Sequence, residues 1–552
     1  MKALTTFLFL LATQFANAQI STQTLAFNDI RAQLRADGTF FLSTDTQSGF
    51  TNVDHPASSS INLAGFWMAG KDETGQIRTA TVFDETQTDY EPLDSNFNKI
   101  WSVSRADIEQ HLMDYDDNLV IDDPLHSIYS YPARGNPYSI NPFINGFILP
   151  TNNGGFAPFY DANGDAIYNP DDGDYPDLSL CPYRDTYTDY QSHFFFKTKE
   201  QPTLLQTDPI NMELQANLFG VSDSKSKILN KTLFLSTNLI YTGDVTLDSF
   251  YLGFYVDFAL GCPEDDYIGV SREQNTVYVY NSDNEDEDCD DIVGFGANPP
   301  AVAITMLDQS RLLDENFNEI PSIRHVSIIS GDQIISTDQN ENWQPQNAQQ
   351  VYNLLQGINR NGHPVIENGL MYDGNPLDPS GDTEYARNNE AGKRRVLIST
   401  GPIRLDPGAV NEVLIAFSFL EVNKANHLQN AAAAHECLAD FEQYFDQFDQ
   451  MSPFCSIDNP NIPDCKRVLS STKEERPFDF QLHPNPVAHQ LNIESDVAFD
   501  ELVIYDAFGR LHWQQHQQAT NTLDVSRWVD GVYFVKVVKD GEAEVRGFVV
   551  KR

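Results

Sequence analysis

The chain has 552 residues, of which 41% are hydrophobic and 12% aromatic, so it can hold more than one domain and bury large cores. Its formal net charge is -45. A surface this negative repels phosphate groups, which argues against nucleic acid and anionic membranes as partners and favours divalent cations, although solubility alone also explains such a charge.

The first 18 residues have the form of a signal peptide. Lys2 is followed by an apolar run from Ala3 to Ala12, which is too short to span a bilayer. Ala16-Asn17-Ala18 has the small-x-small pattern of a signal-peptidase site, so we expect cleavage before Gln19 and an exported mature chain. No later segment approaches 18 uninterrupted apolar residues, and we therefore expect no transmembrane segment.

Six cysteines would meet an oxidising compartment after export, where disulfides form. They are Cys181, Cys262, Cys289, Cys437, Cys455 and Cys465. Six cysteines allow 15 different pairings, and the sequence does not select among them. Cys455 and Cys465 would close a short loop rich in Pro and Asn, which makes them the favoured local pair. No CxxC motif occurs, so the pattern does not indicate a zinc or thioredoxin-like site.

Residues 19–465 are predicted to form a β-rich body. In its first part, the segments 61–69 and 76–83 flank a turn at 70–75, which is the pattern of strand, turn and strand. A helix is predicted over Arg105 to Tyr115, with Ser104 at its N-cap and Asp107 in a capping box.

The middle and end of the body carry the strongest strand patterns, rich in aromatic and β-branched residues. The predicted strands are 232–241, 250–258, 276–280, 324–329, 395–400 and 413–420. The last two flank Asp406-Pro-Gly408, which is turn chemistry, and a helix is predicted over Asn423 to Phe448. The expected fold class is mainly β, a large sandwich-like body of packed sheets with a few helices.

A change of composition separates the body from a compact tail. Residues 466–477 are polar and charged and are interpreted as a linker. Residues 478–552 contain at least five short alternating strands separated by Gly509, Gly531 and Asp540-Gly541. This spacing predicts a small C-terminal immunoglobulin-like β-sandwich.

The tail resembles the type A C-terminal sorting domain of the type IX secretion system of Bacteroidota. The matching elements, in order, are His483-Pro-Asn-Pro-Val487, Leu491-Asn-Ile493, Val503-Ile-Tyr-Asp506, Phe508-Gly-Arg-Leu511, Leu523-Asp-Val-Ser526, Gly531-Val-Tyr-Phe-Val-Lys536 and Lys551-Arg552. The resemblance implies export through the periplasm, recognition of the tail by the secretion machinery, and a final location at the outer-membrane surface or outside the cell. An ordinary immunoglobulin-like accessory domain is the alternative.

The body is similar to large uncharacterised secreted proteins of the same bacteria. The residues that carry this similarity are Ala64-Gly-Phe-Trp-Met-Ala-Gly70, Trp101-Ser-Val-Ser-Arg105, Asp161 to Pro176, and Gly294-Phe-Gly-Ala-Asn-Pro-Pro300. That group implies no activity.

The acidic stretch DANGDAIYNPDDGDYPD, residues 161–177, is a candidate calcium loop. Calcium prefers six to eight oxygen ligands on a flexible backbone. At dockerin-like spacing the candidate ligands are Asp161, Asn163, Asp165, the Ile167 carbonyl, Asn169 and Asp172. A structural calcium ion with an affinity of about 10⁻⁴ to 10⁻³ M is predicted. The alternative is a solvated acidic turn.

Two other acidic segments are weaker candidates. The run Asp283 to Asp291 lacks alternation and glycine, and we interpret it as a solvated loop held at Cys289. A second oxygen cluster near Cys262 would consist of Asp257, Glu264, Asp265 and Asp266.

The sequence contains no recognisable catalytic motif. HExxH, GxSxG, a P-loop and GxGxxG in a strand-helix setting are all missing, and His435 has no second histidine one turn away. Trp67, Trp101 and Trp343 are expected in cores rather than on a sugar-binding surface. We therefore expect a non-enzymatic, calcium-stabilised binding or adhesion module whose ligand is an extracellular polysaccharide or protein. The alternative is a secreted hydrolase that acts on an extracellular polymer.

Overall fold

The computed structural model describes most of the body and of the tail. The described residues are 19–43, 48–149, 157–165, 167–177, 179–180, 183–200, 204–222, 228–307, 325–330, 344–358, 360, 362, 372–422, 426–435, 441, 480–495, 500–506, 511–516, 522–529, 531–539 and 542–552. The predicted signal peptide, the linker 466–477 and Trp343 lie outside them, as do Cys181, Cys437, Cys455 and Cys465.

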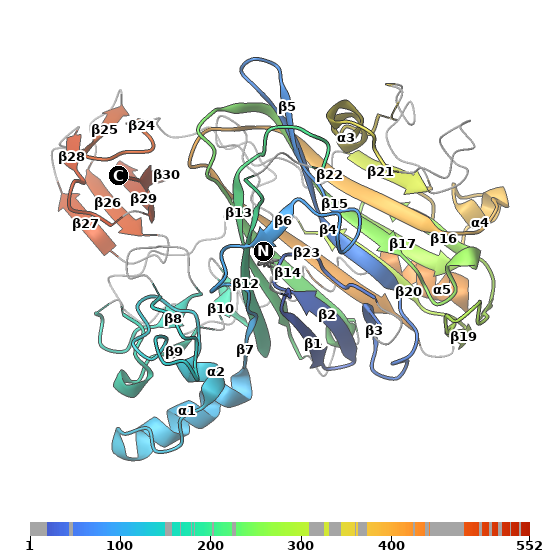
Figure 1. Cartoon of the computed structure of the whole chain (residues 1–552), viewed down its shortest axis with the longest axis horizontal. Coiled ribbons are helices and arrows are strands. Elements are labelled where there is room, and N and C mark those ends of the chain that lie inside the picture. The colour runs from blue at the N-terminus through green and yellow to red at the C-terminus, as the bar shows by residue number, and fades with distance from the viewer. Residues whose placement is uncertain are drawn as a thin grey trace, which may run out of the picture.

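Two large antiparallel sheets form the body (Figure 1). The nine-stranded sheet runs in the order β16 (Asp266–Ser271), β17 (Thr276–Asn281), β20 (Ala301–Met306), β23 (Val410–Leu420), β14 (Thr232–Tyr241), β13 (Met212–Gly220), β12 (Tyr190–Thr198) and β6 (Tyr90–Pro92), with β7 (Trp101–Ser104) also paired to β12. The five-stranded sheet runs in the order β21 (His325–Ser330), β22 (Arg394–Leu405), β15 (Leu247–Phe258), β4 (Ile61–Asp72) and β5 (Ile77–Ala80). The mainly β fold predicted from the sequence is confirmed.

The main core lies between these two sheets. Phe66 and Phe254 from the five-stranded sheet pack with Phe417 and Phe194 from the nine-stranded sheet in one buried aromatic cluster. Phe40, in the segment after β2, joins them. The core also includes residues of the three-stranded sheet β1 (Thr22–Phe27), β2 (Ile30–Arg35) and β3 (Phe50–Asn52). Burial of these rings, at about 25 cal/mol per Å² of apolar surface, is the main stabilising contribution of the body.

Short helices cover the outer faces of both sheets. Helix α5 (His427–Ala432) and the 3-10 helix η4 (Ala433–His435) pack on the nine-stranded sheet against Tyr278, Tyr280 and Phe234. Helix α3 (Ala348–Leu355) packs on the five-stranded sheet, and α4 (Glu384–Arg387) lies next to β16. The predicted helix 423–448 begins within this region, but most of its second half lies outside the described residues.

The turn at Asp406-Pro-Gly408 connects strands of different sheets. The sequence correctly predicts a strand on each side, but β22 belongs to the five-stranded sheet and β23 to the nine-stranded sheet. Thr246 donates a hydrogen bond to Asp406 at 2.8 Å, which ties this corner to the start of β15. The chain therefore passes from one layer of the body to the other at this turn.

A smaller unit, residues 105–177, extends from the end of β7, and we call it the loop-and-helix region (Figure 1). It contains α1 (Arg105–Asn118), α2 (His126–Tyr129), β8 (Phe159–Tyr160), η1 (Pro170–Asp172) and β9 (Tyr175–Pro176). The predicted N-cap is confirmed, since the Ser104 side chain accepts the Asp107 N–H and Asp107 accepts the Ser104 N–H in return. The region has its own core around Ile128, Tyr131 and Tyr168.

The tail forms a small β-sandwich, as the sequence predicts (red in Figure 1). Its three-stranded sheet is β24 (Phe480–His483), β25 (Gln490–Ser495) and β28 (Thr522–Asp524). Its four-stranded sheet is β27 (Leu511–His516), β26 (Glu501–Asp506), β29 (Gly531–Lys539) and β30 (Glu542–Val550). A core with Leu491, Ile504, Val535 and Phe548 lies between the two sheets.

Candidate functional site

The acidic loop of residues 161–174 is closed at its base by a two-stranded ribbon. Strands β8 and β9 pair in antiparallel register, with Phe159 opposite Pro176 and Tyr160 opposite Tyr175. The rings of Tyr160 and Tyr175 stack at 4.8 Å between centroids. Tyr160 is exposed and Tyr175 is half-buried, so this stacked pair lies at the surface beside the acidic residues.

Three of the predicted ligand side chains organise the loop backbone. Asp161 accepts the Gly164 N–H at 2.7 Å, Asn163 accepts the Asp165 N–H at 2.9 Å, and Asp165 accepts the Ile167 N–H at 2.7 Å. Each bond is a local turn of the kind that Asp and Asn favour. These turns coil the chain and bring the side chains of Asn163 and Asp165 within hydrogen-bonding distance of each other.

The far end of the loop returns to the same side chains. The amide nitrogen of Asn163 lies 3.2 Å from Asp165 Oδ2 and 3.3 Å from Asp172 Oδ2, and the amide nitrogen of Asn169 lies 2.6 Å from Asp172 Oδ2. The structure thus brings together four of the six predicted ligands. The fifth, Asp161, contacts the same turn through Gly164, and Ile167 contacts it through its N–H group.

The donor set fits calcium in its chemistry, since every one of the six positions offers an oxygen. In the geometry observed, however, amide nitrogens of Asn163 and Asn169 point to Asp172, so both amides would have to turn their oxygens toward an ion. Among the described residues, no three His, Cys, Asp or Glu side chains are grouped closely enough to hold a metal ion. Calcium at this loop stays a prediction.

Asp174 is the buried anchor of the loop, and it is not one of the six predicted ligands. Its carboxylate accepts the N–H groups of Ala162 and Asn169, both at 2.8 Å, and the residue is fully buried. Burial, together with the charges of Asp161 and Asp165, raises the pKa of Asp174 to about 6, although two backbone N–H groups oppose the shift. Only its place at the end of the acidic run signals this role in the sequence.

Two tyrosines bind the side chain of Asp171. The hydroxyl of Tyr129 donates to one carboxylate oxygen and the hydroxyl of Tyr138 donates to the other, with the two rings 4.7 Å apart. Burial, together with the Asp171 carboxylate, raises the pKa of Tyr138 to about 12 and that of Tyr129 further. Both phenols therefore stay protonated at neutral pH, where they donate hydrogen bonds and do not act as bases.

Exposed apolar side chains concentrate in the loop-and-helix region. The most exposed are Phe143 at 91%, Ile148 at 71%, Met113 at 68%, Leu119 at 68% and Ile140 at 57%. No large hydrophobic side chain in the other described residues reaches 57% exposure, and Leu377, at 54%, comes nearest. The same region holds 13 acidic and two basic residues. The region therefore combines a strongly acidic composition with the most exposed large apolar side chains among the described residues.

The predicted solvated loop at Asp283 to Asp291 is partly wrong. Cys289 does hold it, through a disulfide with Cys262 that the sequence did not select. Asp286 in the middle of the run is buried and accepts the N–H groups of Cys262 at 3.0 Å and Phe295 at 2.7 Å. The favoured pair Cys455 and Cys465 lies outside the described residues.

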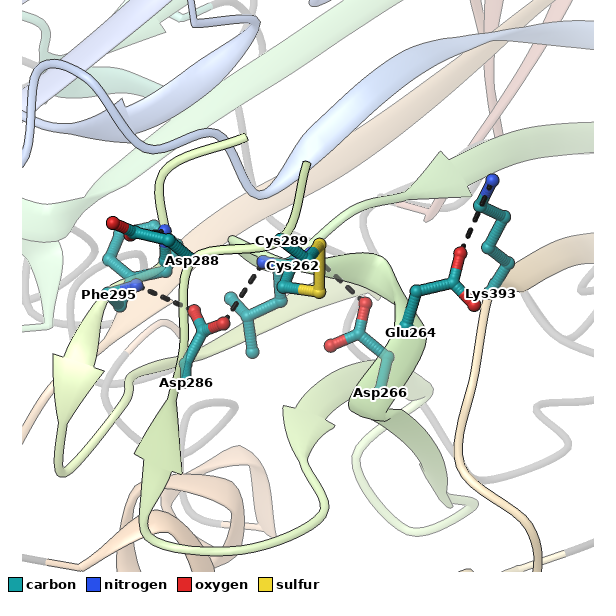
Figure 2. The surroundings of a disulfide bond; sticks show 10 residues. Cys262, Glu264, Asp266, Asp286, Asp288, Cys289, Phe295 and Lys393 are labelled. Carbon is teal, nitrogen blue, oxygen red and sulfur yellow. Dashed lines mark hydrogen bonds and ion pairs between the residues drawn. A yellow bond between two sulfur atoms is a disulfide. The ribbon is translucent and has the colours of Figure 1, made fainter. Parts of the chain in front are cut away.

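The second predicted oxygen cluster is only half formed. Asp257 pairs with Arg395 at 3.1 Å, and Glu264 pairs with Lys393 at 3.6 Å, so these two carboxylates have cationic partners. Asp266 remains near Cys262 and Asp286 (Figure 2), and Asp265 lies close enough to Asp286 for the two charges to interact. The sequence could not show which carboxylates would meet cations from β22 and the segment before it.

The remaining candidate residues have structural surroundings. Trp67 is fully buried and stacks on Tyr255 at 5.0 Å, and Trp101 is buried with its indole N–H 2.9 Å from Asn145 Oδ1. His435 contacts the Tyr278 hydroxyl at 3.2 Å. Among the described residues, no helix combines the length and apolar character needed to cross a membrane.

Comparison with known proteins identifies the tail. Residues 481–551 match the family described as "Secretion system C-terminal sorting domain". No curated protein sequence matches the chain. Among solved structures, a polysaccharide lyase shows 7% identity with a TM-score of 0.18 over 65% of this chain, and the chain spans 35% of that lyase. This likeness is too low to carry an argument about fold or function.

Proposed function

From the premise that this chain is exported to the cell surface or beyond by its type IX sorting domain, we propose that the body is a non-enzymatic binding or adhesion module. Its binding surface is the loop-and-helix region, and its ligand is an extracellular polymer, either a neutral polysaccharide or a protein. The binding is stabilised by calcium in the acidic loop.

The observation that carries the proposal is that Phe143, Ile148, Met113, Leu119 and Ile140, all in one region, are more exposed than any large apolar side chain in the other described residues. Covering such a side chain contributes about 1.5–3 kcal/mol when burial is complete. Exposed apolar side chains that cluster in one part of a protein are typical of an interaction site.

Charge restricts the class of polymer. With 13 acidic and two basic residues, the loop-and-helix region repels sulfated or uronic-acid-rich chains and nucleic acid. A neutral polysaccharide meets no such barrier, and the surface ring pair of Tyr160 and Tyr175 offers an aromatic face on which a sugar ring can pack.

In this proposal calcium rigidifies the binding surface rather than taking part in chemistry. The ion would be held by Asp161, Asn163, Asp165, the Ile167 carbonyl, Asn169 and Asp172. It would neutralise carboxylates that repel one another and fix the loop on the β8–β9 ribbon. Calorimetric titration of the Asp165→Asn/Asp172→Asn double variant tests this role, because the double variant should lose the heat assigned to the loop.

Retention and cleavage assays separate binding from catalysis. The purified full-length chain is applied to an array of neutral and acidic polysaccharides and proteins, and both bound protein and released products are measured. Retention on a neutral polymer without products supports the proposal. Released products would overturn it in favour of a secreted hydrolase, and a preference for strongly anionic polymers would overturn the assignment of the surface.

Two surface variants locate the binding face. Phe143→Ser/Ile148→Ser should weaken retention at least about tenfold, because two exposed side chains contribute about 1.4 kcal/mol or more on burial. Leu377→Ser is the matched control, because Leu377 is similarly exposed but lies outside the region. Equal loss of retention in both variants, or none in either, would contradict the assignment.

A further inference from the structure

Asp266 and Asn281 form a buried polar pair beside the disulfide, at a place distinct from the acidic loop. They lie opposite each other on the antiparallel strands β16 and β17, so their side chains share one face of the sheet. Both residues are fully buried. Among the described residues, neither Asp266 Oδ1 nor Asn281 Oδ1 has a hydrogen-bond partner.

The second carboxylate oxygen of Asp266 and the amide nitrogen of Asn281 do have hydrogen-bond partners, and these bonds determine which oxygen of each side chain stays unpartnered. Asp266 Oδ2 accepts the Leu260 N–H at 3.1 Å. The amide nitrogen of Asn281 donates to the backbone oxygens of Glu285 at 2.9 Å and Asp283 at 3.4 Å. The amide of Asn281 cannot rotate to satisfy its oxygen without losing both of these bonds, so the unpartnered oxygen is a property of the fold.

Asp265 supplies a third oxygen of the same kind. It immediately precedes Asp266, and a hydrogen bond links its side chain to that of Asn281. Its Oδ1 atom is buried and has no hydrogen-bond partner among the described residues. Three buried acceptor oxygens thus occur in adjacent side chains, although a buried acceptor without a partner costs about 1–3 kcal/mol.

Nearby charges do not compensate these carboxylates. Asp286 uses both carboxylate oxygens on backbone N–H groups and adds negative charge (Figure 2). Burial raises the pKa of Asp266 well above its usual value, and Arg394, the cation that opposes this shift, is itself paired through two bonds of 3.0 and 2.8 Å with the buried Glu384. A buried charge without a compensating partner is costly, so this arrangement favours an additional cation.

We propose that the side-chain oxygens of Asp265, Asp266 and Asn281 bind a divalent cation beside the Cys262–Cys289 disulfide. The donors are two carboxylates and one amide oxygen, all hard ligands, which favours calcium with water completing its shell. Asp286 is not a ligand, in keeping with the finding that no three acidic side chains among the described residues group around a metal. The ion would link β16 and β17 to the disulfide-closed loop, beyond the binding function proposed above.

Terbium luminescence tests the site directly, because Tyr267 and Tyr280 are adjacent in sequence to Asp266 and Asn281 and can sensitise a bound lanthanide. The full-length chain is stripped with EDTA and titrated with terbium, and calcium is then added as competitor. Thermal unfolding is measured in parallel, with EDTA and with millimolar calcium. Asp266→Asn and Asp265→Asn should each weaken calcium binding at this site at least about tenfold and remove its share of the thermal shift.

Asp165→Asn/Asp172→Asn is the control, since it removes carboxylates only from the acidic loop and should keep the calcium response of this site. Asp265 is partly exposed, so its variant keeps the test valid if Asp266→Asn does not fold. Calcium binding that is unchanged in both the Asp265 and Asp266 variants, or no calcium response at millimolar concentration in the wild type, would overturn the inference. Loss of polymer retention plays no part in this test, so failure of the binding proposal is seen separately.

Discussion

Removal of the Cys262–Cys289 disulfide should destabilise the body by a predictable amount. The bond closes a loop with a sequence separation of 27 residues. The entropy model of chain cross-linking gives about 3.5 kcal/mol for a loop of this length. Cys262→Ala/Cys289→Ala tests this value with little other change, because the backbone bonds between Cys289 and Ile292 and the Asp286 bond to the Cys262 N–H do not involve either sulfur atom.

Calorimetry of the full-length chain measures the effect. For a cooperative unit of roughly 450 residues, the unfolding entropy is about 1 kcal/mol/K, so 3.5 kcal/mol lowers the melting temperature by about 4 °C. The two single variants provide an internal control. Each breaks the same bond, so each should lose nearly as much as the double variant. A double variant within about 0.5 °C of the wild type, or single effects that add, would refute the cross-link argument.

Three further outcomes concern export, a buried ion pair and pH. Deleting residues 481–551 should keep the protein in the periplasm, which immunoblots of cell fractions and medium will show, and undiminished export would contradict the role of the sorting domain. Glu384→Ala should cost about 3–5 kcal/mol in urea unfolding because it leaves Arg394 buried without its carboxylate, whereas Glu384→Gln should cost less. Burial raises the pKa of Asp257 from 3.8 to about 6 despite Arg395, so the folded protein binds this proton more tightly than the unfolded chain. Stability should therefore fall as pH rises from about 4 to 6, by up to about 3 kcal/mol, and Asp257→Asn should flatten that slope; an equal slope in both proteins would argue against the assignment.

The strands were predictable because their residues carry the signal locally. Thr232 to Tyr241 is predicted and observed as one strand, since its β-branched and aromatic residues favour extended backbone wherever the strand lies. The capping box at Ser104 is local in the same way. The partners of each strand were not predictable. The residues Asp406-Pro-Gly408 indicate that the chain turns, but they do not indicate which sheet the strand before the turn or the strand after it joins.

The candidate sites show the same division. Spacing alone placed Asn163, Asp165, Asn169 and Asp172 in one turn, because all four lie within ten residues. Asp266 and Asn281 are brought together by the pairing of β16 and β17, which the sequence does not specify. Nothing in the sequence around Asn281 indicates that this residue is buried next to Asp266. The pair can be recognised only when the pairing of β16 with β17 is known.

The position of β23 in the nine-stranded sheet has a consequence for the order of folding. This strand comes from residues 410–420, yet it lies between β14, from residues 232–241, and β20, from residues 301–306. Until β23 emerges from the ribosome, β14 and β20 each expose an unpaired edge, and the nine-stranded sheet lacks the strand that joins its two halves. A growing chain thus cannot complete this sheet until nearly the whole body has been synthesised, and over that interval its unpaired edges are vulnerable to strand-to-strand aggregation.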